Sequence, residues 1–281
     1  MKILAGLIIF VTVIISVAVI AALIFRGRYL SDVKAALSHP APVRPEILTE
    51  ESIASLPGPV QRYIRYTGAL GNPVVRNMKI TFTGQIRSAE DSPWMNFTTE
   101  QYNFQDTARR LFFMKARMKG LPVAGYHAFK NGVAYMDIRL LSLVKVQYQD
   151  GEKMNVAETV TFFNDMCCMA PGSLIDDRIE WLETEGNVVK AAFANNGIRI
   201  TAWLHFNDEG ALVNFVSDDR WALEEGGKLS QVRWETPLYG YREINGHRLA
   251  SSADLIYKYP SGDFCYGKFV MGSISYNVIE Y

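Results

Sequence analysis

The sequence has few cysteines and no excess charge of either sign, and each of these absences excludes one class of protein. Only three cysteines occur in 281 residues, so the chain is not a small domain held together by a disulfide framework. Lysine plus arginine equals aspartate plus glutamate, at 29 each. The sequence shows no basic cluster interleaved with aromatic residues, so we do not expect a nucleic acid as partner.

The sequence also lacks a recognisable catalytic, nucleotide or metal motif. The four histidines share no spacing typical of zinc ligands. The acidic pairs 176–177 and 218–219 offer the oxygen ligands that hard cations prefer, but they match no known calcium-loop spacing. We therefore predict no metal, no cofactor and no catalytic residue, and favour a protein that is not an enzyme while leaving that question open.

One long apolar run does stand out, at the N-terminus. From Ile3 to Phe25 the chain carries no charge, and as a helix this run would extend roughly 35 Å, enough to cross a hydrocarbon core of about 30 Å. We predict that residues 1–28 form a transmembrane anchor. The alternative is a cleaved secretory signal with small residues at 19–21, but the apolar run continues well beyond that position.

The side of the membrane is weakly specified. Basic residues flank the run at both ends, with Lys2 before it and Arg26 and Arg28 after it, so the positive-inside rule is nearly balanced. Long domains are translocated largely regardless of charge. We expect a single-pass membrane protein whose globular part lies outside the cytoplasm.

Proline and turn signals divide the rest of the chain. Residues 29–48 contain Pro40, Pro42 and Pro45 and predict a proline-rich, semi-rigid linker. The globular domain is then expected to occupy residues 49–281. Two short helices are predicted near 50–67, with Thr49 as a cap and Pro59 in a first helical turn.

From Val74 onward the apolar pattern has a period of two, and pairs such as Asn131-Gly132 and Asn196-Gly197 predict tight hairpins. The fold class is therefore mainly β (α+β), a large curved antiparallel meander of about a dozen strands. A single helix, predicted at 155–169, interrupts the meander, and Asn155 with Glu158 has the spacing of a capping box. Such a helix usually packs on an open face of the sheet.

Four polar residues fall on one face of this predicted helix: Glu158, Thr161, Asp165 and Cys168. If that face lines a cleft, Glu158 and Asp165 have the chemistry of an acid and a base. The simpler interpretation places Glu158 in the helix cap and Asp165 in solvent. The adjacent thiols of Cys167 and Cys168 have no histidine within thirty residues of the chain, which favours buried structural cysteines over a nucleophile.

Aromatic residues are frequent in the predicted strands and are typical of a sheet core. They also suit the wall of a hydrophobic pocket inside a curved sheet. Together with the polar helix face, this gives the candidate ligand-binding residues, which are Glu158, Asp165, Cys168, Trp203, Trp234 and Tyr241.

Several stretches, spread from about residue 56 to residue 277, resemble an uncharacterised family of bacterial membrane-anchored proteins that contain a domain of unknown function. The stretches are Leu56–Tyr63, Tyr66–Gly68, Asn164–Cys167, Ala170–Pro171, Leu174–Asp176, Ser217–Arg220, Trp234–Pro237 with Tyr241, and Tyr276–Asn277. The resemblance implies membership of that family but assigns no role to any residue.

The leading interpretation of function is a binding module, tethered to the bilayer, that holds a lipid-like or other apolar ligand in a curved sheet. An interaction or scaffold domain of the cell envelope is the first alternative, with a protein partner that the sequence does not identify. The second alternative is a hydrolase that uses carboxylates near Asp165, Asp176 or Asp219, which would require two of them to converge in a cleft.

Overall fold

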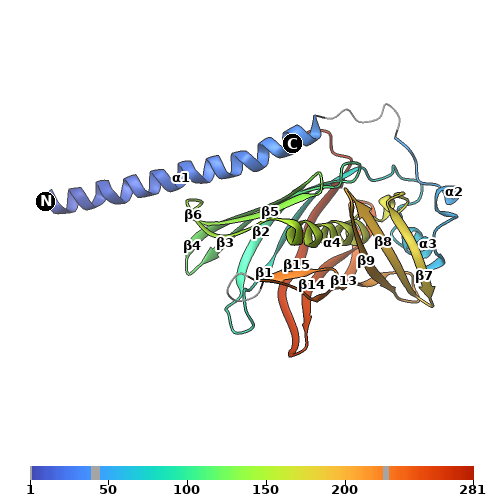
Figure 1. Ribbon diagram of the computed structural model, residues 1–281. Coiled ribbons are helices and arrows are strands. Elements are labelled where there is room, and N and C mark those ends of the chain that lie inside the picture. Colours follow the sequence, from blue (N-terminus) through green and yellow to red (C-terminus); the bar gives the residue numbers. More distant parts are fainter. Residues whose placement is uncertain (1, 39–44, 224–227) are drawn as a thin grey trace.

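The structure is a computed structural model that describes residues 2–38, 45–223 and 228–281. In these residues thirteen strands form one antiparallel sheet, and two short strands form a separate ribbon. The large sheet curves without closing into a barrel (Figure 1). Four α-helices accompany the sheet. The predicted fold class, a mainly-β protein built on a large curved antiparallel meander, is confirmed.

The helices are α1 (Lys2–Leu37), α2 (Glu50–Ile53), α3 (Gly58–Tyr66) and α4 (Glu152–Met169), with a 3-10 turn, η1 (Pro171–Ser173), directly after α4. Thr49 caps α2 as predicted, because its hydroxyl accepts a hydrogen bond from the backbone N–H of Ser52. Pro59 lies in the first turn of α3. The two short helices expected near 50–67 are therefore α2 and α3.

The strands of the large sheet lie in the order β6-β5-β4-β3-β2-β1-β15-β14-β13-β10-β9-β8-β7, and the ribbon is β11-β12. Their bounds are β1 (Asn77–Ile86), β2 (Met95–Phe104), β3 (Arg109–Met118), β4 (Leu121–Lys130), β5 (Val133–Leu140), β6 (Val144–Gln149), β7 (Ile179–Glu185), β8 (Val188–Asn195), β9 (Ile198–Phe206), β10 (Leu212–Ser217), β11 (Trp221–Leu223), β12 (Leu229–Gln231), β13 (Arg233–Ile244), β14 (His247–Tyr259) and β15 (Gly262–Tyr276).

This strand order gives the sheet two arms. The first and last strands, β1 and β15, pair at its centre, so one arm runs outward to β6 and the other to β7. These two edge strands are consecutive in the chain, and α4 connects them. An 18-residue helix is about 27 Å long, and α4 contacts β5 of one arm and β9 and β10 of the other. It therefore lies across the concave face of the sheet.

Tight turns join the strands where the sequence predicts them. The Asn-Gly pairs 131–132, 196–197 and 245–246 connect β4 to β5, β8 to β9 and β13 to β14, and all six residues have φ between +49° and +79°. Asparagine and glycine adopt this left-handed conformation at low cost, and it matches the twist of the flanking strands.

The N-terminus of α4 differs from the prediction. The helix begins at Glu152. The residue before it is Gly151, which has φ +87°, and no side chain caps the first turn. Asn155 instead accepts a hydrogen bond from the backbone N–H of Ala134, at 2.8 Å, and Glu158 forms an ion pair with Arg110. The predicted capping box is therefore wrong, because tertiary contacts occupy both side chains.

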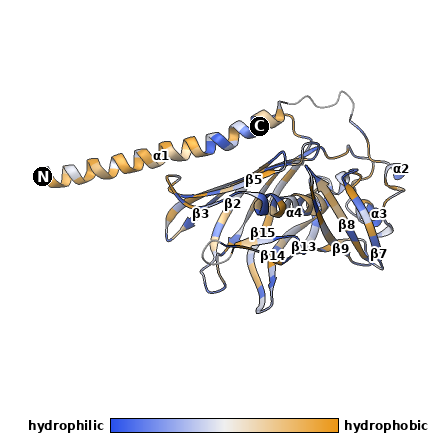
Figure 2. Ribbon diagram, in the orientation of Figure 1, coloured by the Kyte–Doolittle hydropathy of each residue, from blue (hydrophilic) through white to orange (hydrophobic). Residues whose placement is uncertain are grey.

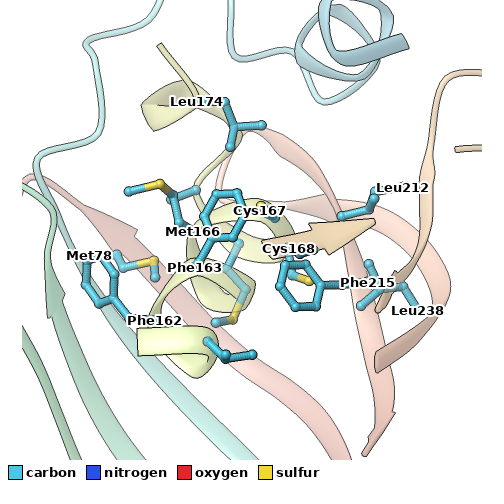
Figure 3. Packing of buried hydrophobic residues seen from close by; sticks show 14 of the residues in the cluster. Met78, Phe162, Phe163, Met166, Cys167, Cys168, Leu174, Leu212, Phe215 and Leu238 are labelled. Atoms are coloured by element: carbon cyan, nitrogen blue, oxygen red, sulfur yellow. The ribbon is translucent and has the colours of Figure 1, made fainter. Parts of the chain in front are cut away.

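One side of α4 is fixed to the C-terminal arm by aromatic packing. The ring of Phe163 stacks on that of Phe193 with centroids 5.1 Å apart and meets Phe215 edge-on at 5.8 Å. Figure 3 shows Phe163, Met166 and Phe215 close together in the cluster that fills this side of the concave face. The other side of α4 remains available for a site.

The C-terminal part of α1 packs on the outer face of β2, β3 and β4. Phe25, Tyr29 and Val33 are at most 1% exposed, and the Tyr29 ring lies 5.3 Å from that of Phe113 and 5.6 Å from that of Tyr126. These three strands are therefore covered on both faces, by α1 outside and by the core inside. This explains why consecutive residues are buried, without alternation, in parts of β2, β3 and β4.

The N-terminal part of α1 is exposed and apolar, as its hydropathy colours show (Figure 2). Within the described residues, α1 is the helix long and apolar enough to cross a membrane by length and composition. The helix continues to Leu37, so residues 29–37, which we expected in the linker, are helical. Residues 39–44 lie outside the described residues, and the division of the chain at 28 and 48 stays a prediction.

Replacing Phe163 by alanine removes the ring that joins α4 to the C-terminal arm. We expect Phe163→Ala to lower the free energy of unfolding by about 3–5 kcal/mol, because the side chain is fully buried and the cavity left behind adds to the lost burial. Urea denaturation of the full chain in detergent measures it. Leu182→Ala, on the exposed side of β7, is the control. Equal effects of the two substitutions would contradict this packing.

Candidate functional site

A cavity of about 540 Å³ lies inside the curve of the sheet, beside α4. Strands of both arms and the β11-β12 ribbon contribute to its wall, since alternate side chains of a strand point to the concave face. Most of these side chains are apolar, and they include Phe82, Ile86, Phe112, Val123, Ile138, Val146, Leu223, Leu238, Leu255 and Phe269.

Methionine is concentrated in this wall. Of the ten methionines in the chain, seven line the cavity: Met95, Met114, Met118, Met136, Met154, Met169 and Met271. The unbranched thioether side chain adapts its shape at low cost and recurs at surfaces that accept several apolar partners. The wall is therefore suited to a flexible apolar guest more than to one rigid shape.

A buried ion-pair network forms the polar part of the wall. Arg110, on β3, donates from Nε to Asp165 Oδ2 at 2.8 Å and from Nη1 to Glu158 Oε2 at 3.2 Å. Both carboxylates belong to α4, and all three side chains are at most 8% exposed. The network thus ties α4 to the N-terminal arm, opposite the aromatic packing on its other side.

Two amides complete this network. Gln101 and Asn103, on β2, donate to the same oxygen of Asp165 at 2.7 and 3.0 Å. Asp165 Oδ2 therefore accepts three hydrogen bonds, all of them from protein groups. Its position is consequently fixed by β2 and β3 and not by solvent.

Glu158 and His127 have pKa values displaced by this environment. Burial is the largest single influence on Glu158 and acts against its charged form, but Arg110, His127 and Arg220 together outweigh it, and the pKa of Glu158 is lowered. For His127, burial dominates and lowers the pKa to about 4. Near neutral pH the cavity therefore contains an ionised Glu158 and an uncharged imidazole.

Arg220 is the second guanidinium in the cavity wall. It lies between the ribbon and the sheet, with Cζ 5.4 Å from the centre of the Trp234 ring. Its Nε is buried without a hydrogen-bond partner in the described part of the chain. The guanidinium of Arg220 also bonds to Tyr266, but its Nε can still donate a hydrogen bond, whereas Arg110 is engaged by two carboxylates.

Four of the six predicted ligand-binding residues reach the cavity wall: Glu158, Asp165, Cys168 and Trp234. The shared helix face of Glu158, Thr161, Asp165 and Cys168 does line a cavity. Asp165, which the simpler interpretation placed in solvent, is buried and hydrogen-bonded. Cys168 is 5% exposed, and burial raises the pKa of its thiol. The thiol is therefore protonated at neutral pH and is a poor nucleophile.

The other predicted residues lie elsewhere. Trp203, on β9, contacts Lys190 and Arg233 through its ring, and Tyr241 donates to the carbonyl of Leu212 at 2.7 Å. Neither is among the cavity-lining residues.

The carboxylates of the hydrolase alternative also separate. Asp165 lines the cavity, whereas Asp176 pairs with Arg178 and Asp219 accepts from the backbone N–H of Thr201. Asp176 and Asp219 are not among the cavity-lining residues. The cleft carboxylates are instead Glu158 and Asp165.

Sequence reasoning missed Arg110, His127 and Arg220. For Arg110 a signal existed, since it shares the inward parity of β3 with Phe112 and Met114. A single arginine in an apolar stripe of a strand indicates a buried partner of opposite charge. His127 has the same inward parity on β4, but Arg220 follows the end of a strand, where no periodicity marks it.

The fold and the cavity define a class of protein: a single curved antiparallel sheet, crossed by one helix, around an apolar cavity with a polar network in its wall. The chain belongs to a family of unknown function, DUF6544, whose family model matches residues 46–269. The resemblance to an uncharacterised family is therefore confirmed. No curated protein matches the chain.

The solved structures to which the chain is similar are distant from it. A LolA superfamily protein from Nitrosomonas europaea has a TM-score of 0.42 at 7% identity, covering 78% of this chain and 92% of that one. A putative outer membrane lipoprotein-sorting protein domain from Vibrio parahaemolyticus has a TM-score of 0.39 at 9% identity, covering 72% of this chain and 86% of that one. A DUF1329 family protein from Desulfovibrio piger has 0.41 at 11%, covering 78% and 92%. Likeness at this level says nothing of what this cavity binds.

His127 should make the fold sensitive to mild acid. Its imidazole binds a proton near pH 6.5 when the chain is unfolded but only near pH 4 when folded, so the unfolded state takes up more protons between these values. We expect the free energy of unfolding to fall by about 2 kcal/mol from pH 7 to pH 5 on this account. Lowering of the Glu158 pKa acts only at lower pH.

Urea denaturation at pH 7 and pH 5 measures this loss. His127→Gln should remove most of it, because the titrating group is gone, while His247→Gln, on β14 outside the cavity wall, should leave it in place. An undiminished loss in His127→Gln would show that His127 is not the cause.

Proposed function

We propose that this chain is a membrane-tethered binding module that holds a lipid-like ligand in the cavity of its curved sheet. The observation that carries the proposal is the cavity itself, about 540 Å³ in volume and walled mainly by apolar side chains. Small-molecule sites usually enclose roughly 300–1,000 Å³ and combine an apolar lining with a few fixed polar groups.

The composition of the wall supports a flexible apolar chain as the buried part of the ligand. Seven methionines give the wall an adaptable surface. An empty cavity lined in this way is costly, since its walls lack the dispersion contacts of a packed core. Binding of an acyl-like chain restores those contacts and removes apolar surface of both partners from water.

The polar end of the ligand is expected at Arg220. Arg110 already donates hydrogen bonds to Asp165 and Glu158. Arg220, with a buried Nε that lacks a partner, favours a ligand whose polar end carries oxygen acceptors, such as a carboxyl or ester group. The ligand is therefore an amphiphile and not a plain hydrocarbon.

Helix α1 supplies the tether in this proposal. Its apolar stretch matches a membrane span in length and composition, and the domain follows it outside the cytoplasm. A binding module held in this way meets lipid-like molecules at the bilayer, where their concentration is highest. A cleaved signal in place of an anchor would leave the cavity function unchanged but would release the domain.

Filling the cavity should abolish ligand binding. Leu238 lines the cavity from β13, while its neighbour Tyr239 points to the outside and is 49% exposed. We expect Leu238→Trp to weaken binding of a fluorescent fatty acid by the full chain in detergent at least tenfold, because the indole occupies the ligand volume. Tyr239→Trp, on the same strand, should bind normally. Equal affinity of both variants would sink the proposal.

Replacing Arg220 tests the polar end separately. Arg220→Met keeps the unbranched apolar stem of the side chain but removes the guanidinium and its donors, and a hydrogen bond to a charged group is worth about 1.5–3 kcal/mol. We expect the affinity for the fatty acid to fall ten- to a hundredfold and that for its hydrocarbon analogue to change little. Arg233→Met, whose guanidinium pairs with Asp218, is the control. A parallel loss for both probes would exclude Arg220 as the headgroup contact.

A further inference from the structure

Two neighbouring hairpin tips carry apolar side chains that are exposed on the outside of the molecule. Residues 118–121 join β3 to β4 and residues 141–146 include the turn from β5 to β6; we call them together the tip edge. The backbone N–H of Leu141 donates to the carbonyl of Pro122 at 2.8 Å, so the two tips are adjacent. Five apolar side chains of the tip edge are 38–58% exposed: Met118, Leu121, Leu143, Val144 and Val146.

The surroundings of the tip edge are basic. Lys115, Arg117, Lys119 and Lys145 are all exposed. From residue 107 to residue 149 the sequence contains one acidic residue, Asp137, which is buried and paired with Arg139 and Arg28. Exposed apolar residues within a basic surround are typical of a surface that binds anionic lipid headgroups and the acyl boundary beneath them.

Helix α1 points toward the same edge. Along its packed part, Asp32 pairs with Lys130, at the end of β4 remote from the tips. Further toward the N-terminus, Phe25 lies against Arg139, with Cζ 4.7 Å from the ring centre, and Arg139 is opposite Ala124, near the tip. The N-terminal continuation of α1 therefore projects on the tip-edge side, as Figure 1 shows.

The reach of the strands brings the tip edge level with the apolar stretch. Phe25 packs against Phe113 of β3, with ring centroids 5.8 Å apart. From Phe113 the strand continues for 118 − 113 = 5 residues to Met118, about 16 Å at ~3.3 Å per residue. The β3–β4 tip therefore lies alongside the end of the apolar run, and the β5–β6 turn lies near Phe25, because Arg139 contacts Phe25 and pairs with Lys145.

The wall of the cavity reaches this edge. Met118 and Val146 belong both to the cavity wall and to the exposed tip edge. A ligand that leaves the cavity past these two side chains therefore arrives at the apolar, basic surface beside α1.

We propose that the tip edge lies in the headgroup region of the bilayer that α1 spans, so that the mouth of the cavity faces lipid. A lipid-like ligand then passes between bilayer and cavity without crossing water. The partner is an anionic lipid bilayer. The passage of ligand rests on the function proposed above, whereas contact of the tip edge with lipid does not.

A fluorescent probe at the tip edge tests the contact. In the full chain with Cys265→Ser, Cys167 and Cys168 remain but are buried, so an NBD label goes to an introduced Val144→Cys. In vesicles of phosphatidylcholine with phosphatidylglycerol, we expect blue-shifted emission that nitroxide-labelled lipids quench. The matched control is Val133→Cys, on the β4–β5 turn at the opposite edge and 61% exposed, which should emit as in water. Water-like, unquenched emission at Val144 would overturn the proposal.

Charge reversal tests the role of the basic surround in transfer. We expect Lys119→Glu with Lys145→Glu to slow uptake of a fluorescent fatty acid from these vesicles at least tenfold, and to leave binding of the same probe from detergent unchanged. The control is Lys190→Glu with Arg199→Glu, on the β8–β9 hairpin of the other arm, which should transfer normally.

The outcomes separate the two proposals. If the unsubstituted chain does not bind the fatty acid in detergent, the binding module is refuted. The quenching result would then still test contact between the tip edge and lipid. Normal binding together with an unquenched tip edge, or with transfer unaffected by charge reversal, would refute the lipid-facing mouth.

Discussion

The ion pairs between Arg110 and the two carboxylates of α4 join the helix to the N-terminal arm of the sheet and border the cavity. α4 must cross the concave face because it connects the two edge strands of one open sheet. Its aromatic side is packed into the C-terminal arm, and Glu158 and Asp165 tie its other side to β3. Removing Arg110 would leave two buried carboxylates unpaired, at a cost of about 3–5 kcal/mol. The arms are thus fixed at a distance that leaves a cavity between them.

The two strands that supply this network, β2 and β3, also carry α1 on their outer face. Arg110 and Phe112 point inward from β3 while Phe113, between α1 and the sheet, points outward. Any rearrangement of β3 would therefore alter both the cavity wall and the surface on which the N-terminal helix packs. In a chain anchored by α1, the mouth of the cavity and the bilayer would have a defined relation, set by packing and not by a flexible stalk.

Local patterns in the sequence predicted much of the fold. The Asn-Gly hairpins, the short helices after Thr49 and the inserted helix all follow from residues within a few positions of one another, and the structure confirms them. The predicted capping box failed because Asn155 and Glu158 bond to β5 and β3, not to their own helix. Residues 29–37 looked like part of a linker because the prolines that follow concealed a helical stripe formed by Tyr29, Val33 and Ala36.

The sequence by itself determined the apolar N-terminal helix, the antiparallel meander and the polar face of α4, because each is a matter of short-range periodicity. Only the tertiary structure decided that this face is buried, since Arg110 lies 48 residues from Glu158 and 55 from Asp165 along the chain. It likewise placed Trp234 in the cavity wall and Trp203 and Tyr241 outside it. Which strand faces enclose a void depends on how the whole sheet curves, and no local pattern encodes that curvature.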